Sequence, residues 1–267
     1  MRIGIHCPVD DAEIPDHTCL ACRESSIPRP VRHCDFSHEM LQGMMDSSGR
    51  STAHISATML TAACPRQVYL KQHADYYEDP SKMFAAWRGT MGHKMTEAYP
   101  QDGCIYEQRF ESAIVINGST VKITGAIDKL DIRGKRIEDF KTKSEKKLEK
   151  MVRPDPAHTK QLNIYRWLVK TGWPQEEFEL DGKIYKPGIA SNIDIDHLKL
   201  VYWSMNEPRA LPARLMKMED IEKYVIERAT TIQTLPDVPK TFDPMASVFC
   251  LQWCPVRSAC IEADVGF

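Results

Sequence analysis

Four cysteines lie at the two ends of one long segment of this 267-residue chain. Cys64 stands before a Pro-Arg pair, and the other three, Cys250, Cys254 and Cys260, follow nearly two hundred residues later. Thiols so far apart in sequence act together only if the fold brings them together, typically around a metal ion or cluster. The chain between them must therefore form a domain whose two ends meet.

The composition is that of an ordinary globular protein, with 42% hydrophobic and 27% charged residues. The first residues are too polar for a signal peptide, and no apolar run approaches the ~18 residues of a membrane span. We therefore expect a cytoplasmic protein without a membrane partner, whose clustered cysteines bind metal rather than form disulfides. Because the formal net charge is −2, any contact with nucleic acid must come from local basic patches.

Residues 1–45 contain four more cysteines among prolines and aspartates, with little helical or strand periodicity: Cys7, Cys19, Cys22 and Cys34. A segment this poor in apolar residues needs a cross-link such as a bound metal to stabilise its fold. Four thiols suit a tetrahedral structural zinc. Reduced, unliganded thiols are the alternative, and His17 and His33 are alternative ligands. We predict a zinc-binding module over residues 1–45, followed by a linker at residues 46–52.

The remaining chain predicts a fold of the α/β (α+β) class. Apolar residues at helical spacing predict helices over residues 81–99, 156–170 and 219–235, and Ser56 is a candidate cap for a short helix that ends or kinks at Pro65. Alternating patterns with turn signals at Asn117-Gly118 and Arg133-Gly134 predict a meander of three or four strands over residues 105–142. Further strands are expected near residues 179–187 and 197–204.

The second turn of this meander places two carboxylates together. A turn centred on residues 133 and 134 gives paired positions that sum to 267, so Asp128 lies across from Asp139, at a separation suited to sharing one divalent cation. Lys141 projects from the same face as Asp139. Two acidic ligands and an ammonium suit phosphodiester hydrolysis. On the hairpin alone, a solvated turn with two surface aspartates remains an alternative.

Two helices carry further candidates. His93 lies one helical turn after Gly89 and one turn before Glu97, so its imidazole is a candidate ligand of the same ion. Gln161 and Tyr165 share one face of the next predicted helix and are candidates for holding the lysine or a phosphate. Taken singly, each has a plain alternative, as a packing histidine or as part of an ordinary amphipathic helix.

In this order, these motifs resemble the PD-(D/E)XK nuclease superfamily in its RecB-like branch. With the four outer cysteines, residues 54–262 are similar to the fourth CRISPR-associated protein family of iron–sulfur exonucleases and to the nuclease domain of AddB. The resemblance implies a restriction-endonuclease-like core, a mixed β-sheet flanked by helices. It also implies ligands for Mg²⁺ or Mn²⁺, and further catalytic groups, at these positions: His93, Asp128, Asp139 and the carbonyl of Phe140 as ligands, with Lys141, Gln161 and Tyr165 completing the site.

The resemblance also implies a 4Fe-4S cluster at Cys64, Cys250, Cys254 and Cys260. The spacing Cys250-x3-Cys254 is one residue longer than is usual in the family, and four thiols also suit zinc. We therefore expect a zinc module at residues 1–45, a nuclease domain at 54–248 and a cysteine cluster at 249–267.

The function predicted from these motifs is a metal-dependent DNA exonuclease for single-stranded DNA or DNA ends. Its place is either CRISPR adaptation, beside an adaptation integrase, or phage or bacterial recombination and repair, with a recombination or replication partner. Lysines just beyond residue 141 are candidates for lining the path of the strand. The alternative is a non-catalytic nucleic-acid-binding scaffold with structural zinc and iron–sulfur sites.

Overall fold

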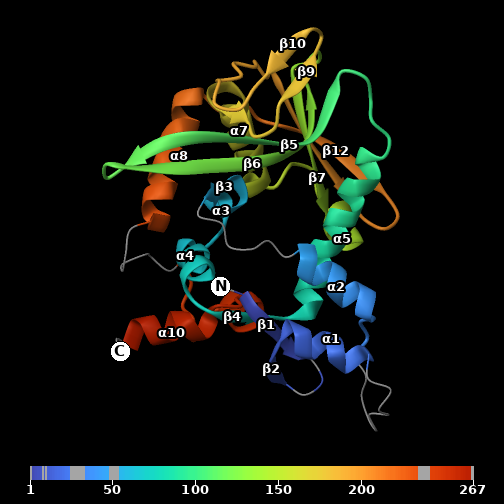
Figure 1. The fold of residues 1–267 in the computed structure, drawn as a ribbon, viewed down its shortest axis with the longest axis vertical. Helices are drawn as coiled ribbons and strands as arrows, with labels where there is room; N and C mark the ends of the chain where they lie inside the picture. Colours follow the sequence, from blue (N-terminus) through green and yellow to red (C-terminus); the bar gives the residue numbers. More distant parts are fainter. Residues whose placement is uncertain are drawn as a thin grey trace. The chain divides into compact units, whose positions relative to one another are not determined.

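The computed structural model describes residues 2–7, 9, 11–24, 34–47, 54–233 and 241–265 (Figure 1). The chain divides into two compact units, each of which we describe by itself. The sheet unit contains Ala53–Ala63 and His93–Thr234. The cysteine unit contains Met1–Thr52, Cys64–Gly92 and Leu235–Phe267. These limits differ from the predicted domains, because the amino-terminal segment, Cys64 and the carboxyl-terminal cysteines all belong to one unit.

A seven-stranded mixed sheet forms the centre of the sheet unit, with its main path in the order β12-β11-β7-β6-β5-β8 and β3 paired with β6. Strand β7 is parallel to β11 and antiparallel to β6. The strands are β3 (Ile55–Ser56), β5 (Cys104–Ile116), β6 (Ser119–Asp131), β7 (Arg136–Thr142), β8 (Trp173–Pro174), β11 (His197–Trp203) and β12 (Pro208–Ala213). The predicted meander is therefore confirmed as three strands, β5 to β7.

The long β5–β6 hairpin forms where the sequence predicts it (Figure 1). Asn117 and Gly118 both have positive φ, at 50° and 79°, which is the conformation that a two-residue hairpin turn requires. The second hairpin turns through four residues between Asp131 and Arg136. Both turns are local features, so the sequence fixes the pairing of these strands.

Helices α3 (Ala57–Thr61), α7 (Pro156–Thr171) and α8 (Met218–Gln233) pack against one another and against the sheet. Asp155 caps α7 by accepting from the Ala157 amide, and the helix ends at Gly172. The predicted helix over 156–170 is thus confirmed, and Ser56 caps α3 as expected. A short helix, α6 (Glu145–Glu149), follows β7.

The predicted strand near residues 179–187 is a small two-stranded hairpin, β9 (Phe178–Leu180) and β10 (Lys183–Tyr185). Strand β12, which pairs with β11, was not predicted. Its sequence, Pro-Arg-Ala-Leu-Pro-Ala, contains two prolines, and proline weakens a strand prediction although an edge strand tolerates it. Tertiary pairing with β11 therefore outweighs the local signal.

The cysteine unit has its own small sheet, in the order β2-β1-β4, and its own helices. The elements are β1 (Arg2–Cys7), β2 (Ala12–Pro15), α1 (Asp16–Glu24), α2 (His38–Ser47), α4 (Pro65–His73), β4 (Tyr76–Glu78), the first part of α5 (Pro80–Glu97), α9 (Val248–Trp253) and α10 (Arg257–Val265). The amino-terminal segment is more regular than its weak periodicity predicted. Part of the predicted linker, residues 48–52, lies outside the described residues.

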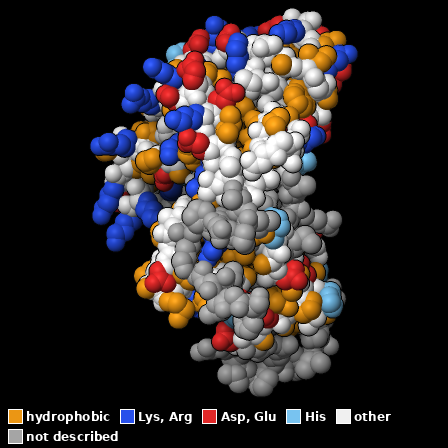
Figure 2. All heavy atoms as spheres, turned by 90° about the vertical axis from the view of Figure 1, so that its left-hand side faces the viewer, with side chains coloured by type: hydrophobic (Ala, Val, Ile, Leu, Met, Phe, Trp, Pro, Cys, Tyr) orange, Lys and Arg blue, Asp and Glu red, His pale blue; other side chains and the backbone are white. Residues whose placement is uncertain are grey.

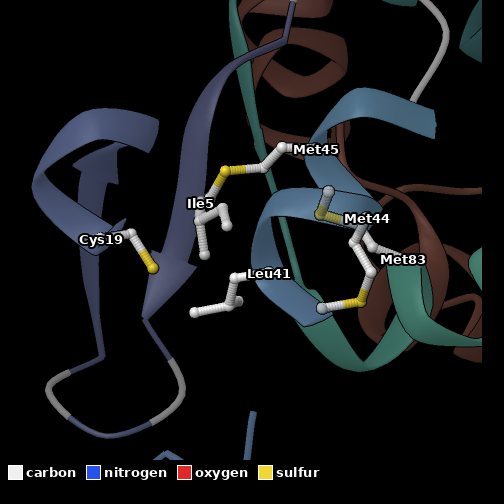
Figure 3. Packing of buried hydrophobic residues seen from close by; sticks show 6 residues of the cluster. All are labelled: Ile5, Cys19, Leu41, Met44, Met45 and Met83. Carbon is white, nitrogen blue, oxygen red and sulfur yellow. The ribbon is translucent and has the colours of Figure 1, made fainter. Parts of the chain in front are cut away.

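An apolar cluster joins four elements of the cysteine unit (Figure 3). Its buried members come from β1, α1, α2 and α5: Ile5, Cys19, Leu41, Met44, Met45 and Met83. Phe84 and Trp87 pack against this cluster. The amino-terminal segment therefore does have a small core of its own, which Met83, Phe84 and Trp87 of α5 complete.

None of the helices in the described part of the chain has both the length and the hydropathy that a membrane span requires. The surface in Figure 2 carries lysine and arginine side chains gathered at one side of the view, with acidic and apolar side chains nearby. On this face positive charge is thus local, which agrees with the formal net charge of −2.

Candidate active site

Two buried aspartates lie side by side where β6 and β7 leave their regular pairing. The ladder pairs Asp131 with Arg136 and Lys129 with Glu138, which confirms the predicted register. The next positions are Asp128 and Asp139, and here the Phe140 amide donates to Oδ2 of Asp128 at 2.7 Å. The two carboxylates therefore share one face of the hairpin.

Burial makes this pair electrostatically costly. Asp128 is 6% exposed and Asp139 is 0% exposed, so both are far from the solvated surface turn that was the alternative. Burial and then the charge of Asp139 raise the pKa of Asp128 to about 7. Burial also raises the pKa of Asp139, against the opposing effect of Lys141. A nearby positive charge would therefore stabilise the ionised forms of both aspartates.

Lys141 supplies part of that charge. Its ammonium nitrogen lies 2.8 Å from Oδ1 and 2.7 Å from Oδ2 of Asp139, and it donates a hydrogen bond to Oδ1. Oδ2 of Asp139 is buried and accepts no hydrogen bond of suitable geometry from the described residues. Lys141 therefore stands on the carboxylate face, as the strand alternation predicted, and pairs with Oδ2 of Asp139 by charge without a hydrogen bond of suitable geometry.

His93, near the end of α5, contributes a second positive group. Its Nδ1 lies 3.1 Å from Oε1 of Glu107, and its Nε2 lies 3.2 Å from the Phe140 carbonyl and 3.6 Å from Oδ2 of Asp128. The hydrogen bond with Glu107, with Asp128 assisting, raises the pKa of His93 to about 9. At neutral pH both ring nitrogens therefore carry protons, and the imidazolium offsets the carboxylates.

Glu107 is a site residue that the sequence reasoning missed. Ligand atoms of His93, Glu107 and Asp128 all lie within 4.8 Å of one another, whereas Glu97, the weaker candidate on α5, is exposed. Glu107 has a positive φ of 50° and interrupts the β5–β6 ladder. The signal was present, because a turn at residues 117 and 118 places Glu107 across from Asp128.

These donors fit a hard divalent cation. Carboxylate oxygens, a backbone carbonyl and one imidazole suit Mg²⁺ or Mn²⁺, and buried carboxylates with raised pKa values gain from a bound cation. Oδ2 of Asp139, which accepts no hydrogen bond of suitable geometry from the described residues, is a further candidate ligand atom. The residues that would hold the ion are therefore His93, Glu107, Asp128, Asp139 and the carbonyl of Phe140.

Proton competition gives a first prediction. Mn²⁺ binding should tighten as the pH rises from about 6 to about 9, because His93 (pKa about 9) and Asp128 (pKa about 7) must lose protons to act as ligands. Calorimetric titration in two buffers of different ionisation enthalpy measures the protons released. Affinity that is independent of pH, with no proton release, would contradict this site.

Helix α7 closes the site from one side. The Gln161 amide donates to the Tyr165 hydroxyl at 2.6 Å and to Oγ1 of Thr58 at 3.2 Å. Burial and then the charges of Asp139 and Asp128 raise the pKa of Tyr165 well above its usual range. The phenol therefore stays neutral beside the carboxylates, and Gln161 and Tyr165 hold each other in position.

Gly125 allows this close approach. A Cβ atom at Gly125 would lie 2.7 Å from Cε1 of Tyr165 and 2.9 Å from Cδ1 of Leu168. Those distances are shorter than side chains tolerate, so any larger residue would push α7 from β6. The glycine in the Gly125-Ala-Ile-Asp128 motif thus sets the distance between Tyr165 and the aspartates.

The four outer cysteines line one pocket in the cysteine unit, together with Leu70 and Phe249 among others. Cys64 precedes α4, Cys250 lies on α9, Cys254 ends α9 and Cys260 lies on α10. Burial and then the charges of Cys64 and Cys260 raise the pKa of Cys250. The fold therefore brings together thiols that are nearly two hundred residues apart.

The amino-terminal cysteines also converge. Cys7 ends β1, Cys19 and Cys22 are one turn apart on α1, and Cys34 precedes α2. Burial and then the charges of Cys34, Cys7 and Cys22 raise the pKa of Cys19 to about 11. The Cys19 side chain points into the apolar cluster (Figure 3), so this thiol is buried whether or not it binds a metal.

Comparison with known proteins bears on the family and the fold. The sequence model of the PD-(D/E)XK nuclease superfamily matches residues 100–261. The fold is similar to that in the crystal structure of SSO0001, with a TM-score of 0.54 and 18% identity, over 83% of this chain and 93% of that chain. A search of curated proteins found no significant match.

Proposed function

The chain belongs to the PD-(D/E)XK nuclease superfamily, and we propose that it is a DNA exonuclease dependent on Mg²⁺ or Mn²⁺, acting on single-stranded DNA or DNA ends. The observation that carries this proposal is the convergence of Lys141, His93 and Glu107, which are partly buried, on the buried pair Asp128 and Asp139. A structural charge network has little reason to bury two adjacent carboxylates.

The side chains have separate roles in this proposal. A bound divalent ion would activate water and polarise the phosphoryl oxygen. Lys141 would donate to a non-bridging oxygen and offset the charge that develops there, which a preorganised ammonium does without reorganising. Tyr165 and Gln161 would keep the strand that bears Asp139 and Lys141 in place.

The rival proposal is a nucleic-acid-binding scaffold without catalysis. It requires no catalytic lysine, yet Lys141 lies on the carboxylate that would hold the ion. The raised pKa values of Asp128 and Asp139 also carry a stability cost, which a scaffold would have no reason to keep. We therefore place the scaffold second.

A cleavage assay tests the choice directly. End-labelled single-stranded DNA should be shortened by the intact protein with Mn²⁺, and left whole with EDTA. The variant Asp139→Asn, which keeps the shape of the side chain, should bind DNA without cutting it. Cutting that survives both EDTA and Asp139→Asn would come from a contaminant, and DNA binding with no cutting in Mn²⁺ would favour the scaffold.

We further propose that Cys64, Cys250, Cys254 and Cys260 hold a 4Fe-4S cluster. Support comes from their shared, largely apolar pocket and from the resemblance to iron–sulfur exonucleases of the RecB-like branch. Four thiolates are the ligands that such a cluster needs. Bound there, it would tie α4 to α9 and α10.

For Cys7, Cys19, Cys22 and Cys34 we propose one structural zinc. Support comes from the charge effect of the other three thiols on Cys19 and from the small size of the core around them. Zinc binding there would join β1, α1 and the start of α2, and its free energy would add to the stability of the fold.

The two cysteine sets give a matched pair of variants, and this is the second prediction. Cys254→Ser should lose iron, colour and most of the soluble protein while keeping zinc. Cys22→Ser should lose zinc and keep iron. Metal analysis of protein purified without oxygen should find close to four irons and one zinc per chain in the wild type. Zinc, rather than iron, lost from Cys254→Ser would overturn the cluster assignment.

The proposed place of work is the cytoplasm, where cysteines stay reduced. Two roles fit the same chemistry, namely processing of DNA fragments for CRISPR adaptation and resection of DNA ends in phage or bacterial recombination and repair. A neighbouring gene for an adaptation integrase favours the first role. A neighbouring replication or recombination cassette favours the second.

A further inference from the structure

His158 lies on α7, three residues before Gln161 and seven before Tyr165, and so shares their side of the helix. None of the nuclease motifs includes it. It is half-buried, and the charges of both Lys141 and Lys143 act on it. A histidine beside the catalytic lysine that the proposed function leaves unused needs its own explanation.

A short chain of hydrogen bonds fixes which ring nitrogen of His158 carries the proton. The Asp155 amide donates to the Tyr202 hydroxyl at 3.0 Å, and that hydroxyl lies 3.0 Å from Nδ1 of His158. Tyr202 is buried, and Nδ1 of His158 is the one acceptor that its hydroxyl proton has among the described residues, so the proton points to Nδ1. The neutral ring therefore carries its proton on Nε2.

The charges around His158 keep the ring neutral. Burial and then the ammonium groups of Lys143 and Lys141 lower its pKa to about 4, against the opposing charge of Asp155. Lys143 lies 3.7 Å from Oδ2 of Asp155 and 5.9 Å from the centre of the Tyr202 ring. Two ammonium groups and one N–H donor thus gather beside the carboxylate site.

The positive charge of these groups is only partly balanced, which favours the binding of an anion. Lys141 is balanced by Asp139 and Lys143 only in part by Asp155, which also caps α7. Nε2 of His158 has no hydrogen-bond partner among the described residues. A phosphate group would accept a hydrogen bond from that N–H and pair with the Lys143 ammonium at the same time.

We propose that His158 Nε2–H and the Lys143 ammonium bind the phosphodiester next to the one that is cut. This inference rests on the proposed function and deepens it, because it assigns a phosphate-binding site for the strand. Tyr202 is a positioning residue, since it acts only by holding His158 in the correct tautomer. The ligand is a backbone phosphate, so the site does not distinguish bases.

Neutral linkages locate the contact. The probes are fluorescent oligothymidylates that each carry one uncharged methylphosphonate linkage, at a different position in each probe. Anisotropy gives the Kd of wild type for each probe, with Ca²⁺ in place of Mn²⁺. Wild type should lose roughly tenfold in affinity at the linkage beside the scissile one, as expected for a lost charged hydrogen bond. His158→Ala should bind the unmodified strand roughly tenfold more weakly. In this variant the methylphosphonate at that linkage should cost less affinity than in wild type, because only the Lys143 ammonium still contacts the phosphate, and the other linkages should behave as in wild type.

Two variants separate contact from structure. His197→Ala, at an exposed histidine that starts β11, should bind like wild type at every linkage. Tyr202→Phe should reduce the affinity that depends on this linkage by less than His158→Ala does. A uniform loss at all linkages in His158→Ala, or an unchanged methylphosphonate profile, would overturn the contact.

The same proteins in Mn²⁺ keep the two proposals distinguishable. The linkage-specific effect without any cutting by wild type supports the phosphate site and overturns the exonuclease. If wild type cuts DNA but His158→Ala keeps the methylphosphonate profile of wild type, the exonuclease proposal is supported and the phosphate site is overturned.

Discussion

Lys141→Ala should lower the rate of DNA cleavage by about 10²- to 10³-fold, the usual cost of removing one preorganised charge-stabilising donor. The ammonium lies within 2.8 Å of both oxygens of Asp139, on the face that would receive the scissile phosphate. Because the charge is needed most as the phosphoryl group reacts, kcat should fall more than the Kd for DNA rises. Single-turnover cleavage and anisotropy measure the two effects separately.

Folding should survive this change when metal is present. Without Lys141 the buried Asp139 loses a partner, but it can take up a proton, since burial already raises its pKa. Lys223→Ala is the matched control, because Lys223 lies on α8 and its side chain is 75% exposed. Cleavage by Lys141→Ala within a few-fold of wild type, with an intact fold, would remove Lys141 from the mechanism.

Local patterns explain why so much of the site could be predicted from the sequence. Asn117-Gly118 forces a tight turn, and the turn after Asp131 fixes which residues of β6 and β7 meet. Alternation along β7 then places Lys141 on the Asp139 face. Each step needs only neighbours along one hairpin, so no tertiary information was required.

Glu107 shows where this reasoning stops short. The turn at residues 117 and 118 places it across from Asp128, but its backbone leaves the ladder with φ of 50°. A regular strand would have fixed its direction by alternation, and the irregular one lets its carboxylate reach His93 instead. That contact joins residues 14 positions apart on two different elements, which no local pattern encodes.

The amino-terminal segment was least predictable for the same reason. Strand β1 pairs with β4 from residues 76–78, and Ile5 packs with Met83. These two partners, β4 and Met83, lie far along the chain from β1, so the weak local periodicity of the segment says little about its structure. Its cysteines were easier to interpret, because their number and spacing indicate a shared ligand without specifying the fold.

Asp128→Asn should raise the stability of the metal-free protein at alkaline pH and reduce the stabilisation that Mn²⁺ gives. Asn keeps the acceptor oxygen for the Phe140 amide but removes one of two adjacent buried charges. The folded-state pKa of Asp128, about 7, lies above its ordinary value of 3.8. The folded wild type therefore binds the extra proton between these pH values, and its metal-free stability falls as pH rises from about 4 to about 7.

The variant lacks this titration, so the two metal-free proteins should melt alike near pH 4 and the variant should melt higher near pH 8. Mn²⁺ should then stabilise the wild type, because a ligand that binds only the folded state shifts the equilibrium towards it. The variant should gain much less and should not cut DNA. Melting curves with EDTA and with Mn²⁺ at both pH values make the comparison. A variant that is less stable at every pH, yet gains equally from Mn²⁺, would make Asp128 a structural residue and move the ion elsewhere.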